Sequence, residues 1–140
     1  MYKQVIVMRK DLNMRKGKMI AQGAHASMKV IVDLFKVSYI DAYNKDEEYD
    51  RFIEYKFATV ADSPLDNWLS GLFKKITVSV DSENELIEIY NKAKEANMLC
   101  SMIEDAGITE FGGVVTKTCC CIGPALSSDI DKITGHLKLL

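Results

Sequence analysis

The chain has 140 residues, a formal net charge of −2, and 48% hydrophobic and 27% charged residues, which suits one globular domain over residues 1–140. No apolar stretch reaches the roughly 18 residues that a membrane span needs, so we expect no membrane partner. A strand pattern at the very start of the chain leaves no targeting segment, and the expected location is the cytoplasm.

The first two predicted elements are a strand and a long helix. An apolar run predicts a strand over Tyr2–Met8, and apolar residues at helical spacing predict a helix from Gly17 to about Tyr39. A basic loop that holds Arg9 and Lys10 separates them.

Residues 41–67 form a charged and aromatic segment that we interpret as an insertion. We expect a helix around Glu47–Phe57 and then a loop that runs through Pro64. A short helix that holds Trp68 and ends at Gly71 should follow.

The next stretch has the pattern of a βαβ unit. Residues Lys75–Val80 alternate and are β-branched, which predicts a strand. Ser82 and Glu85 have the spacing of a capping box at the start of a helix. A buried strand is expected over Leu99–Ile103, parallel to the first and reached by a right-handed crossover.

The last elements are a strand over Thr116–Ile122, which Gly123-Pro124 should stop, and a short helix capped by Ser127 or Ser128. The fold class is therefore α/β: a three-layer α/β/α arrangement with a four-stranded mixed sheet that contains the βαβ unit.

One helix face carries a row of polar side chains. Lys18, Gln22 and His25 stand at i, i+4 and i+7, so they line one side of the helix over two turns. The residues beside them are small, which would let a ligand approach closely. The alternative is an ordinary solvated helix face.

Charge is distributed unevenly along the chain. Residues 1–18 hold six Lys and Arg residues against Asp11 alone, a net charge of +5, whereas residues 41–54 have a net charge of −4. A local basic surface can bind phosphates even when the whole chain is acidic. The sequence is therefore compatible with a nucleic-acid partner but not with a general DNA-binding protein.

A second polar group follows the βαβ unit. Ligands of open α/β sheets bind beyond the carboxyl ends of parallel strands, where Asp105 and Thr109 are expected. If the strand that ends before Asp105 neighbours the first strand, these residues would come close to Lys18. Each also has a structural alternative, because Asp-Ala-Gly is turn chemistry and Thr109 can end a turn.

The cysteines do not have the pattern of a metal site. Cys119, Cys120 and Cys121 are consecutive, so neighbours point to opposite faces of a strand and cannot bind one ion together. We expect them, with Cys100, to pack as small apolar side chains. The sequence also has no GxSxG, P-loop, dinucleotide-binding or HExxH motif.

Four ordered motifs resemble one family. They are KQVIVxRxDLxMxxGKxxAQxAHA (Lys3–Ala26), DAGxTE (Asp105–Glu110), TxTxxxIGP (Thr116–Pro124) and IDKITGxLKLL (Ile130–Leu140). Together they are similar to the peptidyl-tRNA hydrolases of the archaeal and eukaryotic type, over about three-quarters of the chain.

The resemblance implies hydrolysis of the ester between a peptide and the 3′-terminal ribose of tRNA, with no metal and no cofactor. Its implied catalytic residues are Lys18, His25, Asp105 and Thr109, and its implied substrate-binding residues are Arg15, Lys16, Gln22, Thr116 and Thr118. In this assignment Asp105 orients or deprotonates water, Lys18 stabilises negative charge or binds a phosphate, and His25 anchors the site. The expected partner is peptidyl-tRNA; the sequence leaves open whether the chain forms a homodimer.

Two other functions compete with this one. A non-catalytic RNA- or protein-binding module could keep the same fold, but it would not need a carboxylate such as Asp105 beside bound phosphates. A hydrolase of other acyl esters would not need the basic N-terminal segment.

Overall fold

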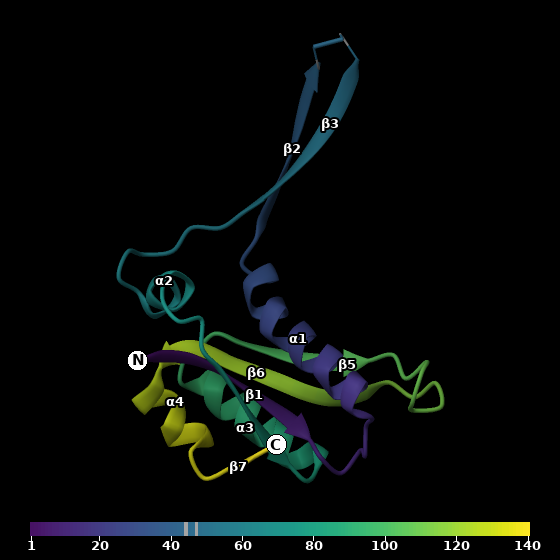
Figure 1. The fold of residues 1–140 in the computed structure, drawn as a ribbon, viewed down its shortest axis with the longest axis vertical. Helices are drawn as coiled ribbons and strands as arrows, with labels where there is room; N and C mark the ends of the chain where they lie inside the picture. The colour runs from purple at the N-terminus through teal and green to yellow at the C-terminus, as the bar shows by residue number, and fades with distance from the viewer. Residues whose placement is uncertain (44, 47) are drawn as a thin grey trace.

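The computed structural model describes residues 1–43, 45–46 and 48–140. Its elements, in chain order, are β1 (Tyr2–Arg9), α1 (Lys16–Val32), β2 (Lys36–Tyr43), β3 (Tyr49–Lys56), α2 (Pro64–Ser70), β4 (Lys75–Val80), α3 (Glu83–Glu95), β5 (Cys100–Asp105), β6 (Thr116–Leu126), α4 (Ser127–Thr134) and β7 (Lys138–Leu139). The chain is thus a mixed α/β protein with four described helices (Figure 1).

The main sheet has five strands in the order β5-β6-β1-β4-β7. β1 pairs with β4 in parallel, whereas β6 is antiparallel to both β1 and β5. The four predicted strands are present, but the expected count of four was wrong. The two-residue strand β7, from the C-terminal tail, adds a fifth beside β4.

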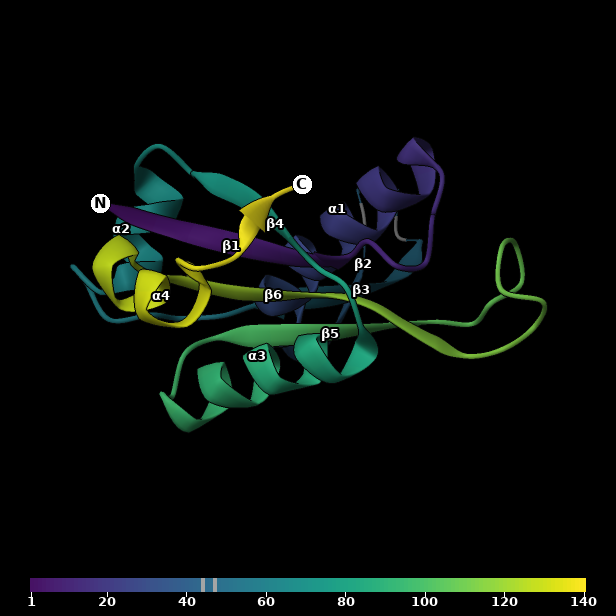
Figure 2. The same ribbon diagram turned by 90° about the horizontal axis from the view of Figure 1, so that it is seen from below.

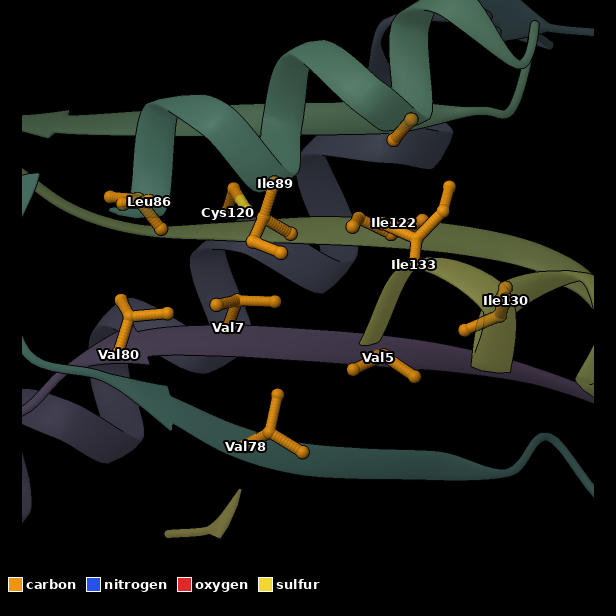
Figure 3. Close-up of a cluster of buried hydrophobic side chains, with 11 residues drawn as sticks. Val5, Val7, Val78, Val80, Leu86, Ile89, Cys120, Ile122, Ile130 and Ile133 are labelled. Carbon is orange, nitrogen blue, oxygen red and sulfur yellow. The ribbon is translucent and has the colours of Figure 1, made fainter. Parts of the chain in front are cut away.

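Helices pack on both faces of this sheet, with α1 and α3 on opposite sides (Figure 2). One core lies between the sheet and helices α3 and α4; it includes Val5, Val7, Leu86, Ile89 and Ile130 (Figure 3). The other core lies beneath α1 and includes Ile6, Met8, Ala26 and Val30. Alternation along β1 therefore supplies both cores from one strand.

The consecutive cysteines follow the same alternation, as predicted. Cys120 belongs to the core beneath α3, whereas Cys119 and Cys121 belong to the core beneath α1. All three are fully buried and free.

The predicted βαβ unit differs from the observed one in its pairing. β4 and β5 point in the same direction, but β1 and β6 lie between them. Strand spacing is about 4.8 Å, so the crossover through α3 spans about 14 Å rather than one strand spacing.

The prediction that the long helix continues to Tyr39 was wrong. α1 ends at Val32, and β2 and β3 pair as an antiparallel hairpin. The predicted helix around Glu47–Phe57 was wrong for the same reason; its first residue, Glu47, lies outside the described residues. Val37 and Tyr39 are two residues apart, as are Ile53 and Tyr55, and that period favours strands.

The hairpin projects away from the sheet at the end of α1 (Figure 1). One of its faces carries exposed Tyr39, Ile53 and Tyr55, and its strands contribute no residue to the three described cores. It is joined to the body through Phe35 and Phe57, whose ring centroids lie 5.8 Å apart.

Three predicted helix or strand boundaries can be compared directly. Ser82 caps α3 as predicted, because its hydroxyl accepts a hydrogen bond from the Glu85 amide. Gly123-Pro124 does not stop β6, because a register shift opposite Lys3 to Val5 lets the strand continue to Leu126. Neither predicted serine caps α4, which begins after Leu126 without a side-chain cap.

Three of the small residues of α1 pack against the sheet, whereas Ala21 and Ala24 are exposed. Gly23, Ala26 and Ser27 are buried against the sheet, and a Cβ at Gly23 would lie 3.7 Å from Ile6. The Ser27 hydroxyl donates to Gln4 Oε1 at 2.6 Å, and Ser101 Oγ donates to the Ala26 carbonyl at 2.7 Å.

The helix criteria for a membrane span are also not met: none of the described helices is both long enough and apolar enough to cross a bilayer.

Removing the hairpin should leave the body folded. Lys36 and Lys56 lie opposite each other in the register, so replacing residues 37–55 by Asn-Gly closes the chain with a two-residue turn. We expect the variant to unfold cooperatively on heating, with a midpoint within a few degrees of the parent. Circular dichroism measures this transition. A non-cooperative transition would show that the hairpin stabilises the core.

Candidate active site

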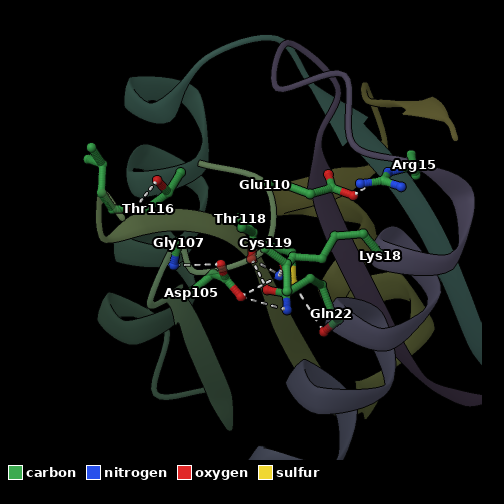
Figure 4. Close-up of polar contacts among 11 residues, drawn as sticks. Arg15, Lys18, Gln22, Asp105, Gly107, Glu110, Thr116, Thr118 and Cys119 are labelled. Carbon is green, nitrogen blue, oxygen red and sulfur yellow. Dashed lines mark hydrogen bonds and ion pairs between the residues drawn. The ribbon is translucent and has the colours of Figure 1, made fainter. Parts of the chain in front are cut away.

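The candidate site lies where the first turns of α1 meet the end of β5 and the loop that follows (Figure 4). Lys18 Nζ donates to Asp105 Oδ1 at 2.6 Å and to Thr109 Oγ1 at 3.1 Å. The Lys18 and Asp105 side chains are only 15% and 14% exposed. Strands β1 and β5 are not neighbours, but α1 lies across both β6 and β5 and so brings Lys18 to Asp105.

A second set of hydrogen bonds connects Asp105 to buried polar side chains of α1 and β6. Gln22 Nε2 donates to Asp105 Oδ1 at 3.4 Å, and Gln22 Oε1 accepts a hydrogen bond from Thr118 Oγ1. Gln22 is 6% exposed and Thr118 is fully buried. Both ends of the amide are therefore engaged, which fixes the side of Asp105 that faces α1.

Asp105 also closes its own turn. Its Oδ2 accepts a hydrogen bond from the Gly107 amide at 2.8 Å. Gly107 has φ +77, and a Cβ there would lie 2.2 Å from the Val114 carbonyl oxygen, so only glycine fits. The structural and the chemical interpretations of Asp105 are thus compatible, because one carboxylate serves both the turn and the ion pair.

The surroundings keep Asp105 ionised. The hydrogen bond from Lys18 is the main cause that lowers the pKa of Asp105 below its ordinary value, and the Gly107 amide and the charge on Lys18 act in the same direction. Burial opposes them without reversing the shift. Asp105 is therefore a carboxylate throughout the neutral pH range and a weak proton acceptor.

Both members of the ion pair keep hydrogen-bonding capacity for a ligand. An ammonium has three N–H donors, and Lys18 directs two of them to Asp105 and Thr109. A carboxylate has about four acceptor positions, and the described residues fill three of those of Asp105. One N–H of Lys18 and one acceptor position on Asp105 Oδ2 therefore have no partner among the described residues.

The other predicted site residues lie around this cluster. Arg15 donates to Glu110 at 3.0 Å and is 82% exposed, and Lys16 is exposed at the start of α1. The Thr116 hydroxyl donates to the Val114 carbonyl rather than to the cluster. His25 is exposed one turn beyond Gln22, close enough for its charge to affect Asp105.

The sequence-based interpretation missed three contributors to the site: the Gly107 amide, Glu110 and Phe111. Phe111 places its ring 5.8 Å from Lys18 Nζ, a cation–π contact. The Asp-x-Gly spacing could have indicated the Gly107 contact, but no local pattern indicates that Glu110 meets Arg15 across the fold. Among the described residues, no group of three His, Cys, Asp or Glu side chains could hold a metal ion.

Comparisons with known proteins identify the family of the chain. Residues 2–140 match the family model of peptidyl-tRNA hydrolase PTH2. The chain is 44% identical to a peptidyl-tRNA hydrolase of Methanocaldococcus jannaschii over 138 residues, which is 99% of each chain. It is 39% identical to that of Saccharolobus solfataricus over 140 residues, all of both chains. The chain therefore belongs to the PTH2 family of peptidyl-tRNA hydrolases.

Proposed function

We infer that this protein hydrolyses the ester between a peptide, or an N-blocked aminoacyl group, and the 3′-terminal ribose of tRNA. The family supports the reaction, and the Lys18–Asp105 pair supports the chemistry. Ester hydrolysis needs an aligned water and a donor for the oxyanion that forms. The acceptor position left on Asp105 and the donor left on Lys18 meet both needs.

Each residue of the cluster receives a role in this proposal. Asp105 orients the attacking water, Lys18 donates to the developing oxyanion, and Thr109 positions the ester beside Lys18. The buried pair of Gln22 and Thr118 positions Asp105. His25, exposed one helical turn beyond Gln22, is the proposed acceptor of the proton from water.

The proposal places the enzyme with its substrate in the cytoplasm. Every described residue of the polar cluster belongs to one chain, and a homodimer stays a proposal. Thr116 stays a proposed substrate contact. It lies on β6, directly opposite Asp105 in the pairing of β5 with β6.

A deacylation assay tests the reaction directly. The purified protein should release the aminoacyl group from N-acetylaminoacyl-tRNA at the same rate with and without a chelator, on a tRNA whose folding is checked separately. A binding module would bind this tRNA without turnover, and a general esterase would cleave a small N-acetylaminoacyl ester equally well.

Lys18→Met and Asp105→Asn should each lower kcat by about 10² or more, because each removes a group that acts in the transition state. Both remove contacts of a partly buried pair, so unfolding should become easier by about 1 kcal/mol. Single-turnover kinetics and thermal melts measure the two effects separately.

Asp131→Asn is a matched control for this experiment. Asp131 Oδ1 also accepts a 2.6 Å hydrogen bond from a lysine, Lys3, far from the site. The Asp131→Asn substitution should have a small effect on stability and none on kcat. If Asp105→Asn melts earlier but hydrolyses the ester at the parent rate, Asp105 is only a turn residue.

Replacing Arg15 and Lys16 by alanine should raise KM with little change in kcat. Both cations are exposed beside the cluster, where they can contact tRNA phosphates. Losing two phosphate contacts should reduce the slope of log(kcat/KM) against log salt by about 1.5. The control is the pair Lys92→Ala and Lys94→Ala on α3, on the opposite face of the sheet. An unchanged slope in the first variant would place the tRNA elsewhere.

A further inference from the structure

The two sides of the candidate site differ in chemistry. The start of α1 carries the exposed cations Arg15 and Lys16, whereas its second half borders a groove of about 470 Å³ against the edge of the sheet. An ester of peptide and tRNA also has two unlike arms, one a polyanion and the other an amide chain. The arms should therefore lie on different sides of Lys18.

The groove is continuous with the site. Its lining includes His25, Met28 and Val32 of α1 and Met102, Ile103 and Glu104 of β5. It begins at the site, because His25 is one helical turn beyond Gln22 and Glu104 precedes Asp105. From His25 to Val32 the helix rises about 10 Å, which matches about three residues of an extended peptide.

The floor of the groove offers backbone hydrogen bonds. β5 is the first strand in the sheet order, so its outer edge has no strand partner among the residues that the structure describes. Alternate residues of an edge strand direct their N–H and C=O groups outward, where an extended peptide can pair with them. Such pairing is independent of the peptide's side chains.

Charge argues against RNA in this groove. The lining holds one carboxylate, Glu104, and one cation, Lys29. Glu104 is paired with Lys117 at 3.2 Å and Lys29 with Asp33 at 2.8 Å, so this lining offers a phosphate no unpaired cation. Met28 and Val32 are 54% and 44% exposed and give the helix side an apolar surface. A phosphate chain gains little from such a lining, whereas an amide chain with apolar side chains gains both contacts and pairing.

We propose that this groove binds the peptidyl part of the substrate, with the residues nearest the ester extended along the outer edge of β5 and covered by Met28 and Val32. This proposal rests on the proposed function. It makes the enzyme prefer substrates with several peptide residues over those with one, whatever their sequence.

The test compares two substrates on one tRNA: N-acetylalanyl-tRNA and N-acetyltetraalanyl-tRNA. The parent should have a kcat/KM roughly tenfold or more higher for the longer substrate, given the contacts of two apolar side chains. The double variant Met28→Gln, Val32→Gln should lose most of this advantage, with a much smaller effect on the shorter substrate. An ester or N-methyl group in place of the second peptide amide should also reduce the advantage in the parent.

Ile20→Gln is the matched control. Ile20 is an exposed apolar residue of the same helix, 73% exposed, and it borders a different hollow beside Met19 and Leu140. It should leave the length preference unchanged.

The outcomes separate this proposal from the proposed function. Hydrolysis of neither substrate would overturn both. Equal hydrolysis of the two substrates by the parent would overturn the groove alone. Equal losses on both substrates in the double variant would also overturn it and would assign the groove to the tRNA arm.

Discussion

The packing of α1 against the sheet is the constraint on which the site depends, because it fixes the position of Lys18 relative to Asp105. Two buried hydrogen bonds, from Ser27 to Gln4 and from Ser101 to Ala26, tie the helix to β1 and β5. Gly23 lets the helix come close enough for contact with Ile6. With the helix fixed at this height, Lys18 reaches the end of β5 across the width of β6. An alanine Cβ would fit at Gly23, 3.7 Å from Ile6, whereas a larger side chain would displace Ile6 or Met8 or lift the helix without touching any polar group of the site.

The charges of Lys18 and Asp105 determine the role that each residue can take in the cluster. Lys18 keeps Asp105 ionised, and a carboxylate with a lowered pKa is better suited to orient a water than to take its proton. In return, Asp105 holds the ammonium 2.6 Å away, beside Thr109. Neither group is isolated in an apolar environment, so the pair needs no large desolvation cost to be preorganised.

The elements that could be predicted from the sequence are those that depend on residues close together in the chain. The alternation of the main strands, the Ser82 cap and the helical spacing of Lys18, Gln22 and His25 are all short-range features. The structure has the four main strands, the cap and the start of the helix where they were expected, although the helix ends at Val32. The hairpin was missed because the two-residue spacing is short on each strand, as at Val37 and Tyr39 or Ile53 and Tyr55, and adjacent apolar residues such as Phe52 and Ile53 interrupt it. Strand order was missed because βαβ patterning gives direction but not adjacency, and the Arg15–Glu110 contact joins segments far apart in sequence. The meeting of Lys18 with Asp105 was expected from neighbouring strands, but a helix that spans an intervening strand produces it.

The three consecutive buried cysteines in β6 are reporters of unfolding, because their chemical modification requires the sheet to open. Burial raises the pKa of Cys119 to about 12, and it raises those of Cys120 and Cys121 as well, so the thiolate that alkylating agents and oxidants attack is almost absent in the native state. β6 is flanked on both sides by strands, and its exposure requires the sheet to open. Modification of these three thiols should therefore proceed at the rate of global opening, while the half-buried Cys100 at the sheet's edge reacts through local motion.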